Sequence, residues 1–371
     1  MKNTNIIVKA KSGSYPIYFG NKIIKSTGSL IKKNIKDTKK VAIICDRNIP
    51  SNFLIRLKKS LKKYQLKIYF LNANEKTKSF KVANRMVENL LKDNLNRSDC
   101  VIAFGGGIIG DLSAFVASLA KRGIKFINIP STLLAQVDSS IGGKTGINSN
   151  KGKNLIGTFY QPSFVIVDIS ILNTLPYREM VCGYAEILKH SLILDKKFFI
   201  WLTKNAKKII EKRDKKLLNL AIIKSCKIKS SVIAKDEREK DIRKILNFGH
   251  TFAHGFEGAP NFSKKMNHGE AVLLGMMTAI EFAYKKKIFN FKDYIMIKKH
   301  YLDLNLPMNI KKKFTFNKID KIISFMKKDK KNYNKKINLI LLKKIGKTIK
   351  PNKIYVNDWV IKKFLKSIYN K

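Results

Sequence analysis

The chain has 371 residues, of which 44% are hydrophobic, and its 76 Lys and Arg residues against 26 Asp and Glu residues give a formal charge of +50. This length exceeds most single cores, so two domains are expected. The four cysteines (Cys45, Cys100, Cys182 and Cys226) include no C-x-x-C pair, and no apolar run approaches the ~20 residues of a membrane span. These features argue against a disulfide framework, a signal peptide and a membrane protein, and we expect a reduced cytoplasmic protein.

The positive charge would ordinarily suggest nucleic acid as a partner. The basic residues are mostly lysines scattered through amphipathic segments such as Ile209–Lys216 and Lys292–Lys299, without an arginine-rich tail or an aromatic RNA-binding pattern. We therefore interpret them chiefly as residues on solvated faces, with a polyanion-binding role as the alternative. The charge predicts a positive field that attracts phosphorylated substrates and makes their binding sensitive to salt.

The first half of the chain alternates strand and helix patterns. A short hairpin is predicted from Ile6–Ala10 and Tyr15–Phe19. Further strands are predicted at Val41–Cys45, Lys67–Leu71, Cys100–Phe104, Lys125–Ile129 and Phe164–Asp168, with helices at Phe53–Leu61, Phe80–Leu91 and Leu112–Ala120. This alternation favours a parallel α/β sheet.

Beyond Leu175 and Pro176 the pattern becomes helical, and only Ile337–Leu341 resembles a strand. We therefore predict a Rossmann-like α/β domain at residues 1–176 and an α-helical domain at residues 177–371. The active site is expected in the cleft between the domains, where ligand sites concentrate.

A glycine pattern follows the strand Cys100–Phe104. Gly105, Gly107 and Gly110 match G-x-G-x-x-G, which lets backbone N–H groups approach a pyrophosphate at a helix N-terminus. The acidic residue expected about 20 positions later is absent, because Leu112–Val137 contains no Asp or Glu. Asp46, at the end of an earlier strand, could supply the ribose carboxylate. The alternative is a tight turn without a ligand.

Three histidines predict a metal site. His250 and His254 are four residues apart, so on a helix they face the same cleft, and His268 begins the next apolar run. Glu186, in GYAEILKHSLIL, is the candidate carboxylate for a mixed His/Glu site with a zinc-like metal. The alternative is that each histidine is an ordinary core or surface residue, because spacing alone does not identify a metal site.

Polar residues near these motifs are candidates for substrate binding. The loop predicted at Pro130–Asn154 is rich in Gly, Ser and Thr, and such loops often bind ligands. The candidates are Asp138, Lys144, Lys153 and Asn154 in that loop, Lys189 one turn after Glu186, and Lys229, Arg243 and Asn247 before His250. Any single lysine of this chain is more often a solvated surface residue.

Six segments together resemble 3-dehydroquinate synthases, which are sugar phosphate cyclases. They are VIAFGGGIIGDLSAFVAS, KRGIKFINIPSTLLAQVDSSIGGKTGIN, KGKNLIGTFYQP, TLPYREMVCGYAEILKH, DEREKDIRKILNFGHTFAH and NHGEAVLLGM. The resemblance runs in order over most of Asp46–Met276, with weaker matches at NEKTKS, DKK and LLKKIG. Related cyclases share individual motifs, but the full set is specific.

The resemblance implies a role for each matched residue. Glu186, His250 and His268 are implied to bind a catalytic Zn²⁺, with Co²⁺ as a second possibility. NAD contacts are implied for Asp46, Asn48, Glu75, Lys78, Gly106, Gly107, Ile108, Asp111, Ser131, Thr132, Asp138, Ser139, Lys144, Lys153, Asn154, Thr174, Leu175 and Glu179. Substrate or catalytic positions are implied for Asp138, Lys144, Lys153, Asn154, Lys189, Lys229, Arg243, Asn247, His254 and Lys330, with Lys331 as the alternative to Lys330.

Two of these roles change the interpretation. His254, first grouped with the metal ligands, becomes a substrate or proton-transfer residue. Arg122 matches an arginine that reaches the neighbouring subunit's substrate phosphate, which implies a homodimer. The sequence also departs from the family pattern at Ala253, Gly255, Ser131 and Cys182. These departures concern local packing rather than the chemistry.

The activity implied by the resemblance is the second step of the shikimate pathway, towards chorismate and the aromatic amino acids. The enzyme converts 3-deoxy-D-arabino-heptulosonate 7-phosphate to 3-dehydroquinate and phosphate, by transient oxidation with NAD, phosphate elimination, re-reduction and aldol closure. The main alternative is a metal- and NAD-dependent alcohol or glycerol dehydrogenase of the same architecture. A nucleic-acid-binding protein and a catalytically inactive relative are further alternatives.

Overall fold

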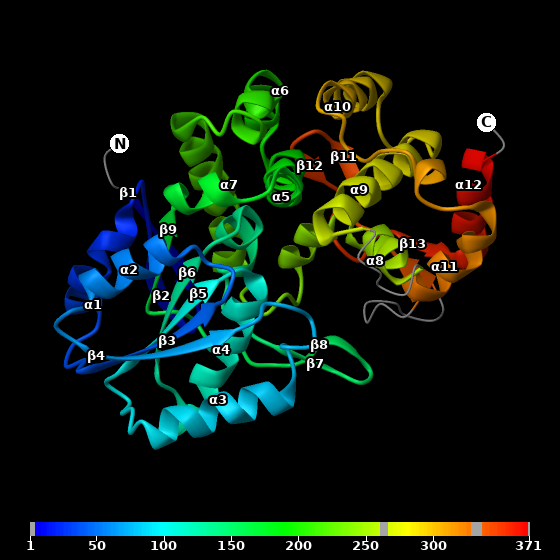
Figure 1. Ribbon diagram of the computed structural model, residues 1–371. Coiled ribbons are helices and arrows are strands. Elements are labelled where there is room, and N and C mark those ends of the chain that lie inside the picture. Colours follow the sequence, from blue (N-terminus) through cyan, green and yellow to red (C-terminus); the bar gives the residue numbers. More distant parts are fainter. Residues whose placement is uncertain (1–3, 260–265, 328–335, 370–371) are drawn as a thin grey trace. The chain divides into compact units, whose positions relative to one another are not determined.

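The structure is a computed structural model that describes residues 4–259, 266–327 and 336–369 (Figure 1). The chain forms two compact units, Met1–Met180 with Arg213–Arg238 and Val181–Lys212 with Glu239–Lys371, and each is described by itself. The segment Arg213–Arg238, which lies in the predicted second domain, makes its contacts in the first unit. The predicted domains 1–176 and 177–371, and the cleft expected between them, stay predictions.

The first unit is built on a seven-stranded sheet with the order β1-β2-β9-β6-β5-β3-β4. The strands are β1 (Thr4–Ala10), β2 (Gly13–Gly20), β3 (Lys40–Asp46), β4 (Gln65–Leu71), β5 (Cys100–Gly105), β6 (Lys125–Pro130) and β9 (Phe164–Asp168). β1 and β2 form the antiparallel hairpin, and the remaining pairs are parallel. The predicted fold class of this half of the chain, a parallel α/β sheet, is confirmed.

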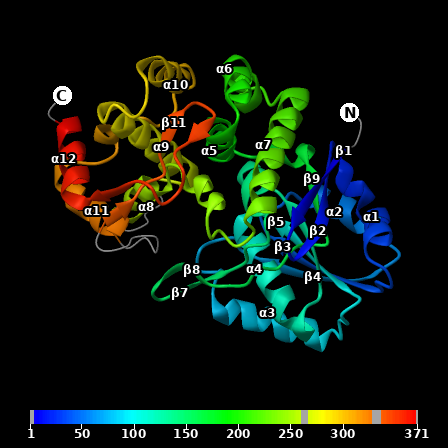
Figure 2. The same ribbon diagram turned by 180° about the vertical axis from the view of Figure 1, so that it is seen from behind.

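Helices cover both faces of this sheet (Figure 1). Ile43 and Ile102 pack in the core with α1 (Thr27–Asn34) and α2 (Ser51–Ser60), whereas Ile44 and Ala103 pack with α3 (Phe80–Lys92) and α4 (Gly107–Leu119). Burial on both faces explains why these strands read as continuous apolar runs. α7 (Lys215–Lys235) lies beside β1 (Figure 2).

The sheet brings several predicted site segments to one edge. Cys45 pairs with Phe104 and Gly105 pairs with Pro130, so the carboxyl ends of β3, β5 and β6 lie next to each other. The segment Pro130–Asn154, predicted as a loop, contains a π-helical turn at Ala135–Ser139 and most of a small hairpin of β7 (Ile147–Ser149) and β8 (Gly152–Ile156). The prediction of a loop without secondary structure was wrong, because strands this short show no clear alternation of apolar and polar residues.

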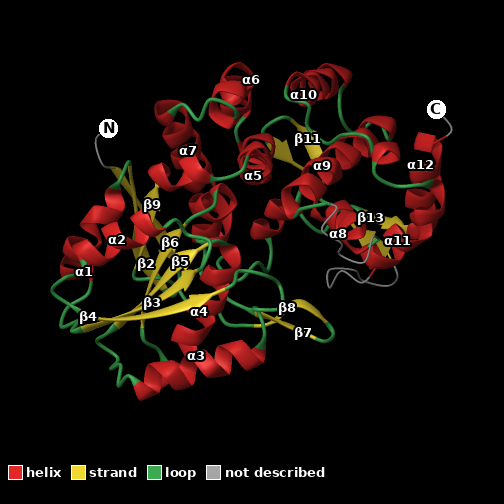
Figure 3. Cartoon of the chain, viewed as in Figure 1, coloured by secondary structure: helices red, strands yellow, loops and turns green. Residues whose placement is uncertain are grey.

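The second unit is mainly helical, as predicted (Figure 3). Its helices are the greater part of α5 (Tyr177–Leu194), α6 (Lys196–Ile210), α8 (His250–Gly258), α9 (His268–Lys285), α10 (Phe291–Asp303), α11 (Ile319–Lys327) and α12 (Asp358–Tyr369). The strands are the pairs β10 (Lys336–Asn338) with β13 (Tyr355–Asn357) and β11 (Leu342–Lys344) with β12 (Lys347–Thr348). The single predicted strand Ile337–Leu341 was wrong in extent, because each of these strands is too short for a periodic pattern.

Short 3₁₀ helices complete the connections, at Ile23–Ser26, Ala120–Arg122, Ile169–Thr174, Ile242–Asn247, Ile310–Lys312 and Phe316–Lys318. Across the described ranges, every helix is too short or too polar to span a bilayer.

Candidate active site

The second unit brings the three predicted metal ligands together. Glu186 lies on α5, His250 is the first residue of α8, and His268 is the first residue of α9. One ligand atom from each residue lies within 4.8 Å of the others. The centroids of the His250 and His268 rings are 5.5 Å apart, and His250 Nε2 lies 3.9 Å from Glu186 Oε1. The three side chains form one group with a carboxylate and two imidazoles.

Glycines allow the helices of this group to approach closely. Gly249 precedes His250 with φ +80°, and a Cβ at Gly249 would lie 2.6 Å from Met276 Cγ. A Cβ at Gly269, directly after His268, would lie 2.3 Å from the Cα of Cys182 on α5. Both contacts are shorter than any real Cβ contact, so only glycine fits. The starts of α8 and α9 are thereby held at fixed positions, and with them the two imidazoles.

The electrostatics of Glu186 test whether this group fits a metal ion. The residue is 1% exposed, and neither carboxylate oxygen accepts a hydrogen bond from the described residues. Lys189, which is 2% exposed, lies against Oε2 as an ion pair. The ammonium of Lys189 offsets part of the cost of burying this charge, and a bound cation would satisfy the oxygen atoms that accept no hydrogen bond. The carboxylate therefore fits a metal ligand.

The state of His250 fits the same role. Its Nδ1 lies 3.3 Å from the carbonyl oxygen of Phe248, which can only accept, so Nδ1 carries the proton and Nε2 presents its lone pair. Burial, together with the charge of Lys189 and the other two imidazoles, lowers the pKa of His250 well below its ordinary value. The ring is thus neutral at pH 7, which is the form that binds metal. Two imidazoles and one carboxylate suit a catalytic zinc-like ion with an open position.

Glu257 is a member of the site that the sequence analysis missed. Its Oε1 lies 3.2 Å from Nδ1 of His268. Burial disfavours the charged form of His268, but the hydrogen bond and the charge of Glu257 outweigh it, so the pKa of His268 is raised. The available signal was spacing, since Glu257 follows His250 by seven residues and lies on the same helix face.

The remaining predicted residues of the second unit differ in their surroundings. His254 is exposed and its ring centroid lies 6.0 Å from that of His250, but it is not part of the ligand group. Arg243 is 3% exposed. Asn247 donates to Glu239 Oε1 at 2.5 Å, and Glu239 is a second residue that the sequence analysis missed. Lys330 and its alternative Lys331 lie outside the described residues.

In the first unit, the glycine pattern lies where β5 turns into α4. Gly106 precedes the helix without a side-chain cap, so the first N–H groups of α4 are available to an anion. The two neighbouring segments close on this turn. Ser131 N donates to Gly105 O at 2.9 Å, and Cβ atoms at Gly106 and Gly107 would lie 3.3 Å from Thr132 Cγ2 and 3.0 Å from Ser139 Oγ. Ile108 follows in the first turn of α4.

Two buried lysines of the first unit bind predicted site residues. Lys78 donates to Asp111 Oδ2 at 2.7 Å and to Asn154 Oδ1 at 2.5 Å. Burial raises the pKa of Asp111, against the opposing effect of Lys78. Lys229 on α7 donates to the carbonyl oxygen and to Oδ1 of Asp138 at 2.6 and 2.5 Å. Residues far apart in the sequence thus form two charged pairs beside the glycine turn.

Predicted NAD residues also hold one another in the loops after β3 and β4. Asn48 donates to Asp46 Oδ1 through its backbone at 3.0 Å and through its side chain at 3.1 Å. Glu75 accepts from Lys153 at 3.4 Å and from Asn148 at 2.6 Å. Asn148 was not predicted, and nothing in its sequence context distinguishes it.

The segment with Thr174, Leu175 and Glu179 is held by an arginine that was also not predicted. Arg213 donates to the carbonyl oxygens of Leu172 at 3.1 Å, and of Asn173 and Leu175. Thr174 Oγ1 donates to Ile171 O at 3.1 Å, and Glu179 N donates to Pro176 O at 3.0 Å. Of the other predicted residues, Lys144 and Arg122 are exposed, and Arg122 has φ +62°.

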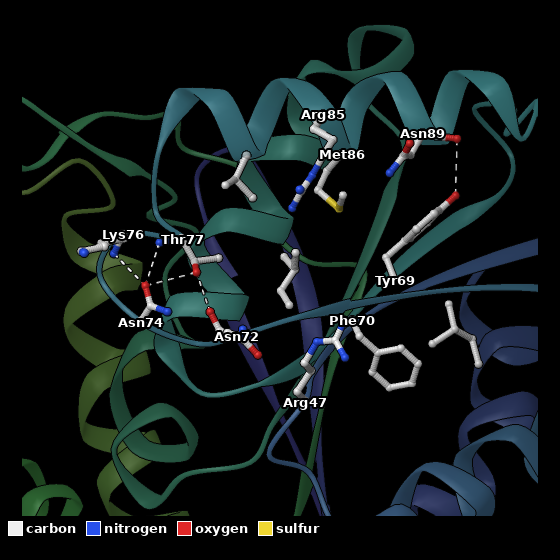
Figure 4. A pocket seen from close by; sticks show the side chains of 13 residues that line it. Arg47, Tyr69, Phe70, Asn72, Asn74, Lys76, Thr77, Arg85, Met86 and Asn89 are labelled. Carbon is white, nitrogen blue, oxygen red and sulfur yellow. Dashed lines mark hydrogen bonds between the residues drawn. The ribbon is translucent and has the colours of Figure 1, made fainter.

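A cavity of about 700 Å³ lies along β4 and α3 (Figure 4). Arg47 enters it from the turn after β3 and Arg85 from α3, and Phe70 and Met86 supply apolar surface. The cavity adjoins two predicted NAD segments, because Arg47 lies between Asp46 and Asn48, and the lining residues Lys76 and Thr77 lie between Glu75 and Lys78. None of its lining residues belongs to the metal-ligand group. Its size therefore does not mark it as the catalytic centre.

Comparisons with known proteins identify the family. Residues 68–182 match the family model for the 3-dehydroquinate synthase N-terminal region, and residues 183–332 match the one for the C-terminal region. The 3-dehydroquinate synthase of Pelagibacter ubique (strain HTCC1062) is 52% identical over 364 residues, which cover 98% of each chain. The chain belongs to the 3-dehydroquinate synthase family. The resemblance inferred from the six sequence segments is confirmed.

Solved structures support the fold of the family. The structure of 2-deoxy-scyllo-inosose synthase, complexed with carbaglucose-6-phosphate, NAD⁺ and Co²⁺, matches with a TM-score of 0.83 and 26% identity, covering 98% of this chain and 99% of that chain. A probable glycerol dehydrogenase from Sinorhizobium meliloti 1021 matches with a TM-score of 0.63 and 11% identity, covering 95% of each chain. The second likeness shows the fold alone, so the dehydrogenase alternative is only a distant fold relation.

The departures from the family pattern lie at packed positions. Cys182 Sγ accepts a hydrogen bond from Gly269 N at 3.1 Å. A Cβ at Gly255 would lie 2.9 Å from Ile322 Cγ2 on α11, and Ala253 packs against Gly275 of α9. Ser131 is 7% exposed.

Proposed function

We propose that this chain is a 3-dehydroquinate synthase that uses NAD and a divalent cation to convert 3-deoxy-D-arabino-heptulosonate 7-phosphate to 3-dehydroquinate and phosphate. The group of Glu186, His250 and His268 carries the proposal, because its buried carboxylate accepts no hydrogen bond and His250 presents Nε2 in its neutral form. Family membership supports the reaction. The ligands named for 2-deoxy-scyllo-inosose synthase support the cofactors.

Zn²⁺ is the proposed ion, with Co²⁺ as the second possibility, held by Glu186, His250 and His268. When bound, the cation lowers the pKa of a substrate hydroxyl while NAD accepts and later returns a hydride. The chain's own residues prepare the group for this role. Phe248 O fixes the tautomer of His250, and Lys189 places a positive charge beside the carboxylate, where it favours anionic oxygen on the substrate.

The NAD residues are proposed to lie around the glycine turn. The uncapped N–H groups of α4 bind the pyrophosphate, with Lys78 and Asp111 fixed as an ion pair beside them. The full proposed set is Asp46, Asn48, Glu75, Lys78, Gly106, Gly107, Ile108, Asp111, Ser131, Thr132, Asp138, Ser139, Lys144, Lys153, Asn154, Thr174, Leu175 and Glu179.

Cationic and amide groups are proposed to bind the substrate's carboxylate and phosphate. Lys144, Lys229 and Arg243 offset the negative charges, and Arg243 can grip an oxyanion with two parallel hydrogen bonds. Asn247, held by Glu239, and the exposed His254 orient the phosphate. The remaining members of the proposed set are Asp138, Lys153, Asn154, Lys189, Arg122 and Lys330.

The quaternary structure and compartment are part of the proposal. We propose a homodimer in which Arg122 reaches the substrate phosphate of the neighbouring subunit. Its exposure and its position beside Gly123, at a turn with positive φ, support a role outside its own chain.

All four cysteines are buried and form no disulfide, which supports a reducing cytoplasm. The domains are proposed as an NAD-binding part, 1–176, and a metal- and substrate-binding part, 177–371.

A paired assay tests this function. Purified protein with Zn²⁺, the heptulosonate phosphate and a trace of NAD is followed for phosphate release and for absorbance at the NADH band. Phosphate released far beyond the NAD present, without accumulating NADH, is the expected result. NADH that rises in step with substrate consumed would indicate a dehydrogenase instead. If neither phosphate release nor NADH formation is detected, the catalytic proposal is refuted and an inactive relative is favoured.

A further inference from the structure

The backbone of His268 is fixed more firmly than its ring. Asn267 accepts from Glu270 N at 2.9 Å and donates its own N–H to Glu270 Oε2 at 3.0 Å, so a capping box sets the start of α9. The contact of Gly269 with Cys182 fixes the same turn. The His268 side chain is nevertheless 38% exposed. Rotation about its two side-chain bonds is therefore limited by its contacts rather than by close packing.

Glu257 supplies the contact that orients this ring. It lies on α8, about 10 Å along the helix from His250, given the 1.5 Å rise per residue. Its Oε1 is 3.2 Å from His268 Nδ1, and its side chain is 17% exposed. The oxygens of Glu257 are outside the group whose ligand atoms lie within 4.8 Å of one another. Glu257 thus contacts a proposed ligand without being one.

The contact also decides which ring nitrogen carries the proton. An ionised carboxylate only accepts hydrogen bonds, so in the neutral ring of His268 Nδ1 donates and Nε2 keeps its lone pair. His250 reaches the same tautomer through the carbonyl oxygen of Phe248. The two partners differ in charge, since Glu257 is anionic and the carbonyl is neutral. A carboxylate behind a ligating imidazole increases the ring's basicity as well as fixing its orientation.

We propose that Glu257 is a positioning residue for the cation, which holds His268 in the Nδ1–H tautomer and directs Nε2 toward Glu186 and His250. The inference rests on the proposed metal site and adds to it a residue that acts through a ligand. The helix α8 then supplies the ligand His250 and, through Glu257, orients the ligand His268.

Two substitutions separate the hydrogen bond from the charge. Glu257→Leu removes both, and Glu257→Gln keeps an acceptor oxygen without the charge. Glu281→Gln is the matched control, because Glu281 lies on α9 in a surface ion pair with Lys285 at 3.6 Å. Zn²⁺ affinity of the full chain is measured by competition with a chromogenic chelator, and the His268 tautomer is read from imidazole ¹⁵N shifts of the metal-free protein.

Glu257→Leu is expected to weaken Zn²⁺ binding ~10- to 100-fold and to populate the Nε2–H tautomer of His268. Glu257→Gln should weaken binding less and keep the tautomer, and Glu281→Gln should match the wild type. Thermal unfolding of each metal-free variant shows whether the fold is retained. If Glu257→Leu does not fold, Glu257→Gln, which conserves the shape of the side chain, is the remaining variant.

Wild-type affinity and tautomer in folded Glu257→Leu would overturn this inference and leave the metal site standing. If Glu257→Leu does not fold, an Nε2–H tautomer of His268 in the wild-type chain would overturn the proposal, and wild-type affinity in Glu257→Gln would overturn the charge contribution. A wild-type chain that binds no Zn²⁺ would overturn both the metal site and the role of Glu257. The proposed function and this inference therefore fail by different results.

Discussion

The tightest glycine contact of the site predicts the effect of a single methyl group. Gly269→Ala places a Cβ 2.3 Å from the Cα of Cys182, and ordinary contact begins at 3.4 Å, so the start of α9 must move by about 1.1 Å. The neighbouring atoms are backbone, so no side chain can rotate away. His268 precedes this residue and moves with it, away from its position beside Glu186 and His250.

The expected cost has two parts. Overpacking of this kind destabilises a protein by about 1–3 kcal/mol, and misplacement of a site group by about 1 Å costs on the order of 10²-fold in rate. Zn²⁺ affinity, thermal unfolding and phosphate release are measured for Gly269→Ala. Glu281→Ala, at a half-buried position of the same helix, is the control. Wild-type Zn²⁺ affinity and turnover in Gly269→Ala would refute the view that this contact positions the ligand.

Three further predictions use other contacts of the structure. His268→Ala should abolish metal-dependent phosphate release and lower the bound metal, and undiminished activity would rule out its role as a ligand. Arg213→Lys should weaken NAD binding in calorimetry by about 5- to 10-fold, because one ammonium cannot span the carbonyl oxygens that the guanidinium joins, whereas Arg56→Lys on α2 should have no effect. Burial lowers the pKa of His300 to about 4 from 6.5, so the folded state resists a proton that the unfolded state accepts. Stability is therefore lost as the pH falls, by about 2 kcal/mol between pH 7 and pH 5. Urea unfolding of His300→Gln should lack this loss, and an unchanged pH dependence would contradict the assignment.

The fold was predictable from sequence where burial leaves a pattern. The strands around Ile43 and Ile102 are apolar throughout because helices cover both faces of the sheet. Their continuous apolar runs predicted both the strands and the parallel sheet. The short pairs in the second unit and the hairpin at Ile147 could not be found in this way. Their strands of two to five residues are stabilised by tertiary context rather than by periodicity.

The candidate site was predictable only in part. Helical spacing grouped His254 with His250 and His268, but the ligand group contains only the last two, because the start of α8 packs against α9 through Gly249 and Gly275. No spacing rule describes contact between two helices. Spacing places Glu257 on the same helix face as His250, but its contact with His268 on the next helix could not be predicted in this way. The resemblance to the family supplied the ligand set that the residues alone left open.

The lysine excess made the functional lysines hard to recognise, and burial separates them. Among the described residues, the buried lysines are Lys78, Lys189 and Lys229, at 5%, 2% and 5% exposure. Each pairs with a carboxylate, Asp111, Glu186 and Asp138 respectively. A lysine without a functional role is expected on a solvated face, where its ammonium stays hydrated. Removing an ammonium from water into the interior costs several kcal/mol per ion unless a partner offsets that cost. Composition alone could not distinguish these three from the other lysines, whereas the cost of burying an ammonium does. The proposed substrate and cofactor roles of these three lysines therefore have a physical basis that is independent of the family resemblance.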